Sequence, residues 1–370
     1  MIRLAFRNLF QNKIRLLISV GGVALALLLI LSLDAIFTGV EQRITVYINN
    51  SGADIFVSQE DVLNMHMASS SLPDSVKGKV EIVPGVASAT PIQYVSNYVV
   101  INDERNPAYI IGLPTEARIG GPWNVSSGLR LPGASEAIID RNIAEKSDVS
   151  LGGAVEILGE EFKIVGLSEE TSSLVNSVAF ISTKDFEELR GRYDTFSFLL
   201  VKVEPGESPQ VVANRIQSRV SDITVQTTYN FAAQERKVVK DMSTDVITIM
   251  NLIGFSIGLA VMALTVYTAT LARRAEYGVL KALGARNAYL YSTVLAQALL
   301  SVAFGFAVGL ALTLAISAIV PRLGLSMVLA VSSASLLKVG SLSLVIAGLA
   351  AILPIRQIAG LDPAMVFRGR

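Results

Sequence analysis

The chain has 370 residues, of which 51% are hydrophobic and only 17% are charged, and this composition is too apolar for an ordinary soluble enzyme of this length. Its formal net charge of zero provides no basic field for nucleic acid, and the lack of cysteine excludes disulfides, thiolate metal sites and cysteine nucleophiles. His66 is the only histidine, so histidine-based acid–base or zinc chemistry is not expected, and the absence of a G-x-x-x-x-G-K-[ST] motif predicts that this chain has no ATP-binding P-loop.

Four apolar runs predict membrane-spanning helices, because about 20 apolar residues cross the hydrocarbon core of a bilayer. The first predicted span is 16–38. The length of this run, without a small-residue cleavage site after it, favours a retained anchor over a signal peptide. The other predicted spans are 246–272, 288–320 and 336–355.

Basic residues predict the orientation of these spans. Lysine and arginine gather before the first span, between the second and third spans, and after the fourth, whereas the short loop between the third and fourth holds only Arg322. By the positive-inside rule, both termini, the segment 273–287 and the tail 356–370 are cytoplasmic. We therefore predict a multi-pass membrane protein with residues 39–245 outside the cytoplasm.

The predicted external domain alternates short β-rich runs with Pro/Gly turns and a few helical segments. Runs such as EAIID and VAFIS are typical of strands, and TKDFEELRG is typical of a short helix capped by Thr183 and closed by Gly191. The predicted fold class is therefore a membrane α-helical protein of four transmembrane helices, with an α+β extracytoplasmic domain inserted between helices 1 and 2.

Three features of this external domain are also expected from its sequence. Residues 119–168 carry the densest strand signals and are interpreted as an insertion into a domain made from both flanks. Helices over 38–50 and 231–245 are expected to continue the first two spans outward as a stalk. The charged stretch 234–241 is interpreted as a solvated part of the second stalk helix.

The segment LARRAEYGVLKALGAR, 271–286, lies between two apolar runs and has helical spacing. Val279, Leu280 and Leu283 fall on one face of the predicted helix, and Gly284 follows the last periodic residue, as expected for a C-terminal cap. The segment is therefore predicted to be a short cytoplasmic helix with one apolar face.

Charged residues of this segment complete the pattern. Arg274 and Lys281 fall on the face opposite the apolar one, whereas Glu276 falls on the apolar stripe itself. A buried carboxylate there needs a partner, and Arg273 at position i−3 can supply one.

Five motifs occur in one order along the chain: LAFRNLFQNKIRLLISVGGVALA, GASEAIIDRNIAEK with LGGAVEILGEEFKIVGL, VKVEPGESPQVVANRI, RRAEYGVLKALGAR and LPIRQIAGLDPAMVFR. With the four-span topology, they make nearly the whole chain resemble the MacB/FtsX-like (type VII) permeases of ABC transporters. The resemblance is to the four-span form without a fused ATPase, which includes exporters of heme, lipids and drugs. It implies an amphipathic cytoplasmic helix over 1–15 and a location in the bacterial cell (inner) membrane.

The resemblance implies a permease subunit with defined partners. Two copies of a cytoplasmic ABC ATPase would bind ATP and Mg²⁺, while this chain itself carries no cofactor and no catalytic constellation. A second permease copy, most simply in a homodimer, the lipid bilayer and an extracytoplasmic adaptor protein are the other candidate partners. The implied function is export or extraction of a small amphipathic or lipid-like molecule, such as heme, by mechanotransmission. The alternative is a force or signal transmitter that transports nothing and activates an extracytoplasmic partner.

The resemblance also assigns the segment 273–287 to ATPase coupling. One interpretation is that its basic residues only follow the positive-inside rule; the other is that its apolar face binds a groove on the ATPase, with Glu276 held by a donor there. The predicted coupling residues are Arg273, Arg274, Glu276, Tyr277, Leu280, Lys281, Leu283 and Gly284.

Small residues within the spans form two G-x-x-x-G patterns, Gly254/Gly258 and Gly305/Gly309. Such spacings permit close helix approach, and they fit either packing within the chain or a dimer interface.

Two further places are candidate ligand sites. Asp34, near the outer end of the first span, and Tyr267, in the second, either line an outer cavity for substrate or serve the membrane interface and helix packing. Met65, His66 and Met67 offer ligand atoms for copper or heme iron, but on a strand the histidine would face away from both methionines. A flexible loop or a surface that faces a partner is the alternative interpretation.

Overall fold

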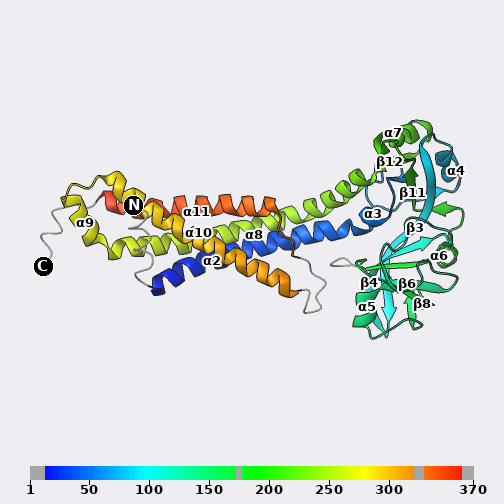
Figure 1. Cartoon of the computed structure of the whole chain (residues 1–370), viewed down its shortest axis with the longest axis horizontal. Helices are drawn as coiled ribbons and strands as arrows, with labels where there is room; N and C mark the ends of the chain where they lie inside the picture. Colours follow the sequence, from blue (N-terminus) through cyan, green and yellow to red (C-terminus); the bar gives the residue numbers. More distant parts are fainter. Residues whose placement is uncertain (1–12, 172–176, 321–328, 361–370) are drawn as a thin grey trace. The chain divides into compact units, whose positions relative to one another are not determined.

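The computed structural model of the chain (Figure 1) describes residues 13–171, 177–320 and 329–360. It divides into two compact units, one formed by Met1–Gly39 with Ser243–Arg370 and the other by Val40–Met242. The predicted amphipathic helix over 1–15 lies almost wholly outside the described residues. Four apolar helices and a mixed α/β domain between the first two of them confirm the predicted fold class.

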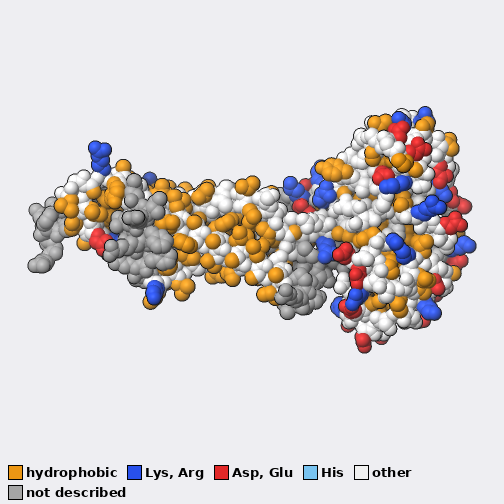
Figure 2. Space-filling view, in the orientation of Figure 1, with side chains coloured by type: hydrophobic (Ala, Val, Ile, Leu, Met, Phe, Trp, Pro, Cys, Tyr) orange, Lys and Arg blue, Asp and Glu red, His pale blue; other side chains and the backbone are white. Residues whose placement is uncertain are grey.

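The first unit is built on long helices that are apolar enough to cross a membrane. Two of them, α2 and α8, extend beyond the unit, because its boundaries fall within them. Hydrophobic side chains cover these helices in Figure 2, as a lipid-facing surface requires. The four helices are α2 (Lys13–Ile44), α8 (Thr228–Ala272), α10 (Asn287–Ile319) and α11 (Ser333–Ala359), and the short α9 (Arg274–Ala282) lies between α8 and α10.

Glycines bring α8 and α10 close to α2. A Cβ atom added at Gly254 on α8 would lie 2.6 Å from an α2 side chain, and one added at Gly305 on α10 would lie 2.7 Å from another. Gly258 and Gly309 also face α2 at short range. Of the two alternatives for these motifs, the structure therefore describes packing within the chain, where the missing side chains permit close backbone approach.

The second unit is a twisted, mostly antiparallel sheet with helices on it. The main sheet has the order β12-β1-β11-β3-β4-β9-β6-β8-β5, with β7 pairing with β3 and β8, and only the pairs β4–β9 and β6–β8 are parallel. Its strands are β1 (Ile55–Gln59), β3 (Val86–Ile101), β4 (Glu104–Leu113), β5 (Val125–Gly128), β6 (Glu136–Asp140), β7 (Ala154–Ile157), β8 (Glu160–Ser168), β9 (Ser177–Ser182), β11 (Phe198–Val203) and β12 (Ile223–Thr227). A second small sheet pairs β2 (Leu72–Pro73) with β10 (Thr195–Phe196).

The short helices of this unit cover its apolar cores. They are α3 (Val46–Asn50), α4 (Ser75–Glu81), α5 (Arg141–Lys146), α6 (Thr183–Arg190) and α7 (Pro209–Arg219). On α7, for example, Val212 and Ile216 are fully buried against the strands, which agrees with their one-turn spacing.

The structure corrects the interpretation of 119–168 as a separate insertion. Its strands β5 to β8 join the same sheet as the flanking segments, since β6 pairs with β9 and β7 pairs with β3. The long β3 makes this possible, because it pairs with β11 in its first half and with β4 and β7 further along.

Two local predictions also change. The side chain that caps α6 is Ser182, whose hydroxyl accepts a hydrogen bond from the Asp185 backbone N–H at 3.1 Å, and not Thr183. The helix predicted over 38–50 is interrupted at Thr45, whose backbone is not helical, so that α3 begins as a new helix. Gly191 closes α6 with a left-handed backbone, as predicted.

Candidate functional site

The short helix α9 is closed by a glycine. Gly284 has a φ of +88°, and its N–H donates to the Lys281 carbonyl at 3.1 Å while the Ala285 N–H donates to the Leu280 carbonyl at 3.0 Å. These two bonds form a Schellman motif, which ends a helix sharply because only glycine adopts this backbone without strain. The chain can therefore turn directly into α10.

The inner face of α9 is anchored to the helical unit. Tyr277 is buried, and Leu280 packs against the same apolar core that α2, α8, α10 and α11 share. Burial raises the pKa of the Tyr277 hydroxyl above its ordinary value. Lys281 donates from Nζ to the carbonyl of Ala359 on α11 at 3.1 Å, which holds α9 against the end of that helix.

The outer face of α9 presents a stripe of three residues. Glu276, Val279 and Leu283 are exposed at spacings of three and four, with the Leu283 side chain 79% exposed. The predicted apolar face is thus divided, because Leu280 points into the bundle while Val279 and Leu283 point away from it.

Glu276 does not need a partner to offset burial, since its side chain is 70% exposed. It pairs with Arg273, whose Nη1 lies 3.7 Å from Oε2 and whose side chain is only 13% exposed, so this pair is open to water on the carboxylate side alone. Arg274 on the same helix is exposed.

An ion pair joins α2 to α11 within the helical unit. Lys338 Nζ lies 2.8 Å from Asp34 Oδ1, and the Asp34 side chain is only 14% exposed. Tyr267, 37% exposed on α8, is not joined to Asp34 by any hydrogen bond among the described residues. The sequence contained both charges, but no local pattern connects residues so far apart in the chain.

The Met65–Met67 segment does not form a common set of ligands. Met65 is buried in the core of the external unit, Met67 is 62% exposed, and the His66 ring turns to a carboxylate. His66 Nδ1 forms a hydrogen bond with Glu235 Oε2, and the His66 ring packs against the ring of Tyr109 with centroids 4.4 Å apart. A single chelate formed by all three side chains is therefore excluded in this arrangement.

Glu235 is the residue that the sequence interpretation missed. It lies in the charged stretch expected to be solvated, yet it is fully buried. Its Oε1 accepts hydrogen bonds from the backbone N–H groups of Met65 and His66, the latter at 3.1 Å. The available signal was its position four residues after Phe231, since these two residues share one buried face of α8.

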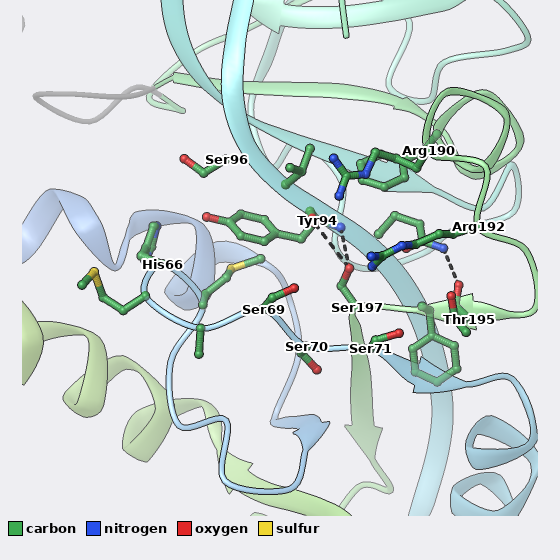
Figure 3. Close-up of a pocket in the computed structure, with 17 residues that line it drawn as sticks. His66, Ser69, Ser70, Ser71, Tyr94, Ser96, Arg190, Arg192, Thr195 and Ser197 are labelled. Carbon is green, nitrogen blue, oxygen red and sulfur yellow. Dashed lines mark hydrogen bonds between the residues drawn. The ribbon is translucent and has the colours of Figure 1, made fainter.

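A pocket of about 210 Å³ opens beside the loop 65–71, the His66 loop (Figure 3). Its walls come from the loop 65–71, from β3, and from the end of α6 with the residues that follow it. The labelled polar side chains include those of Arg190, Arg192 and Ser197, and the Ser197 hydroxyl bonds to the backbone of Tyr94. Neither Arg190 nor Arg192 was predicted from the sequence to be a site residue.

Comparisons with known proteins agree with this architecture. Residues 16–219 match the MacB-like periplasmic core domain, and residues 248–363 match the FtsX-like permease C-terminal domain. An uncharacterised ABC transporter permease of Methanocaldococcus jannaschii is 23% identical over 400 residues, covering 100% of this chain and 97% of that protein. Another uncharacterised ABC transporter permease, from Mycobacterium tuberculosis, is 23% identical over 374 residues, and the alignment covers 100% of this chain and 100% of that protein.

Two solved structures are similar to part of the chain. The periplasmic region of MacB from Actinobacillus actinomycetemcomitans has a TM-score of 0.39 and 13% identity, covering 50% of this chain and 94% of that one. The extracellular domain of the transporter YknZ from Gram-positive bacteria has a TM-score of 0.37 and 16% identity, covering 47% and 98%. The family matches, which account for most of the sequence, establish that the chain belongs to the MacB/FtsX-like ABC transporter permeases, multi-pass membrane proteins with an extracytoplasmic domain.

Proposed function

We propose that this permease couples ATP hydrolysis by a separate ATPase to the export or extraction of a small amphipathic or lipid-like molecule, with heme as one candidate. Membership of an ABC transporter family implies an ATPase partner. In the proposed assembly two permease copies bind two ATPase subunits, which hold ATP and Mg²⁺. Both termini and α9 lie in the cytoplasm, and the Val40–Met242 unit lies outside, in agreement with the distribution of basic residues.

The outer stripe of α9 is the observation that carries this proposal. Val279 and Leu283 are apolar and exposed on a helix whose other face is fixed by Tyr277 and Leu280. Exposed apolar side chains at i and i+4 suit a groove on a partner protein. The adjacent Glu276 carboxylate can accept hydrogen bonds from donors at the rim of such a groove.

The connections of α9 indicate how movement of the ATPase would reach the membrane. The helix lies between the end of α8 at Ala272 and the start of α10 at Asn287, so a push on it acts on both spans. Both spans pack closely against α2 through their glycines, and closely packed helices move together more readily than they deform. The Asp34–Lys338 pair then provides a polar contact between α2 and α11 that helix movement can break.

A docking experiment tests the first part of this proposal. Val279→Ser with Leu283→Ser should abolish co-purification with the ATPase and lower ATPase activity at least about ten-fold in lipid nanodiscs, since two apolar anchors are lost. Leu129→Ser, which changes an exposed leucine of the external unit, is the matched control. If the double variant binds and stimulates the ATPase as the unchanged protein does, α9 is not the docking surface.

A substrate panel tests the second part. Hemin, lipids, peptides and hydrophobic drugs are titrated into the reconstituted complex while ATP hydrolysis is measured. Saturable stimulation by one class, with movement of that compound across the bilayer, supports transport. A coupled ATPase that is indifferent to the whole panel would replace transport with the alternative, force transmission to an extracytoplasmic partner.

A further inference from the structure

The pocket beside the His66 loop has an unbalanced positive charge. Arg190 is in the last turn of α6 and Arg192 follows it, and both guanidinium groups reach into the pocket in Figure 3. Within the described parts of the chain, neither group lies within 4.0 Å of a carboxylate oxygen. Two arginines that line one small pocket without a protein anion leave strong hydrogen-bond donors available to a ligand.

The rest of the lining suits the same kind of ligand. Ser69, Ser71 and Thr195 line the pocket together with the two arginines, and hydroxyl side chains of this kind can donate to oxyanions. Phe186 and Phe196 also line it and are themselves buried. A ligand with an oxyanion at one end and a short apolar part at the other would satisfy both kinds of surface.

The loop that carries Ser69 and Ser71 is held in place by Glu235 on α8. Glu235 on α8 accepts the backbone N–H groups of Met65 and His66 at the start of the loop and also binds the His66 ring. Since Glu235 is fully buried, these bonds are sheltered from water and hold the loop close to α8. The wall is thus a fixed part of the pocket.

Tyr94, which also lines the pocket, has a hydroxyl group without a hydrogen-bond acceptor among the described residues. This hydroxyl is buried. Burial, together with the nearby Tyr109 and Glu235, raises the pKa of Tyr94, so its hydroxyl remains a donor. A buried donor without an acceptor is unusual, and a water molecule enclosed beside the ring would satisfy it.

We propose that this pocket binds a small solute carrying an oxyanion, a carboxylate or a phosphate, between Arg190, Arg192 and the serines of the loop 65–71. Guanidinium groups bind both kinds of oxyanion through paired N–H donors. The volume of about 210 Å³ is sufficient for a small acid. Glu235 is a positioning residue, because it acts on the ligand only through the loop.

The proposal is tested by binding to the full chain in lipid nanodiscs, without an ATPase, so that its outcome is independent of the proposed function. Inorganic phosphate and glutarate are titrated separately by isothermal calorimetry at one salt concentration. We expect saturable binding of at least one, and the arm that binds identifies the oxyanion. Arg190→Gln with Arg192→Gln should weaken that binding at least about ten-fold, because two charge-assisted contacts are removed.

Arg219→Gln is the matched control, since Arg219 is also an exposed arginine in the last turn of a helix of the same unit. Its binding should be unchanged. Glu235→Gln should weaken binding less than the arginine variant does, with faster hydrogen exchange confined to the loop 65–71. No heat with either probe up to about 10 mM, or an equal loss in Arg219→Gln and in the arginine pair, would overturn the proposal.

Discussion

Removing the Glu235 carboxylate should destabilise the external unit severely. In Glu235→Ala, the backbone N–H groups of Met65 and His66 and the His66 ring lose their acceptor. The site is fully buried, so water can replace this acceptor only if the loop opens. Glu235→Gln should be milder, because its amide oxygen still accepts from both backbone groups.

The magnitude follows from these contacts. A buried donor left unsatisfied costs about 1–3 kcal/mol, and breaking a buried charged contact costs about 3–5 kcal/mol in total. We therefore expect Glu235→Ala to lower the free energy of unfolding of this unit by about 3–5 kcal/mol. For a domain of this size that corresponds to a decrease in Tm of about 6–20 °C.

Intrinsic fluorescence during heating measures this effect in the full chain. Trp123 is the only tryptophan of the chain, and it packs against the same apolar core as Phe231, one turn before Glu235. Its emission therefore reports unfolding of the unit that carries the change.

Glu81→Ala is the matched control for this experiment. Glu81 is exposed and pairs with Lys77 at 3.9 Å, a contact worth less than about 1 kcal/mol. The expected order of Tm values is unchanged protein and Glu81→Ala highest, Glu235→Gln lower, and Glu235→Ala lowest. If Glu235→Ala shifts Tm no more than Glu81→Ala does, Glu235 does not hold the loop and the reasoning fails.

Two further predictions concern charges elsewhere. Asp34→Asn leaves Lys338 without its partner and should lower the stability of the helical unit by about 1–3 kcal/mol in nanodisc denaturation. The exchange Asp34→Lys with Lys338→Asp should recover most of this lost stability. An exchange as damaging as the single change would refute a direct pair. Burial, with Asp74 and Asp194 nearby, raises the pKa of Glu187, so folding favours its protonated form and this contribution to stability is lost as the pH rises through the raised pKa. Glu187→Gln should therefore raise Tm at pH 8 and have no effect well below the ordinary range of a carboxyl group, and a difference that stays constant with pH would contradict this.

Local patterns in the sequence were sufficient for the membrane helices and for many elements of the external unit. Apolar runs long enough to cross a bilayer correspond to α2, α8, α10 and α11, because a span requires continuous apolar length and no long-range information. The termination of α9 just before Gly284 also followed from sequence, since a positive φ at that position favours glycine. Caps were less certain, because Ser182 and Thr183 are both suitable and only the backbone path selects one.

Only the tertiary structure decided which residues meet. Asp34 and Lys338 are on different helices, and the pairing depends on how α2 and α11 pack. Glu235 looks solvated by composition, but the sheet and the His66 loop cover its face of α8. Leu280 and Leu283 have similar hydrophobicity, and only the docking of α9 directs one inward and the other outward. The sequence by itself therefore determined the membrane architecture and the family, because both depend on local length, order and motif. The polar contacts and the pocket depend on long-range packing, which local periodicity does not encode.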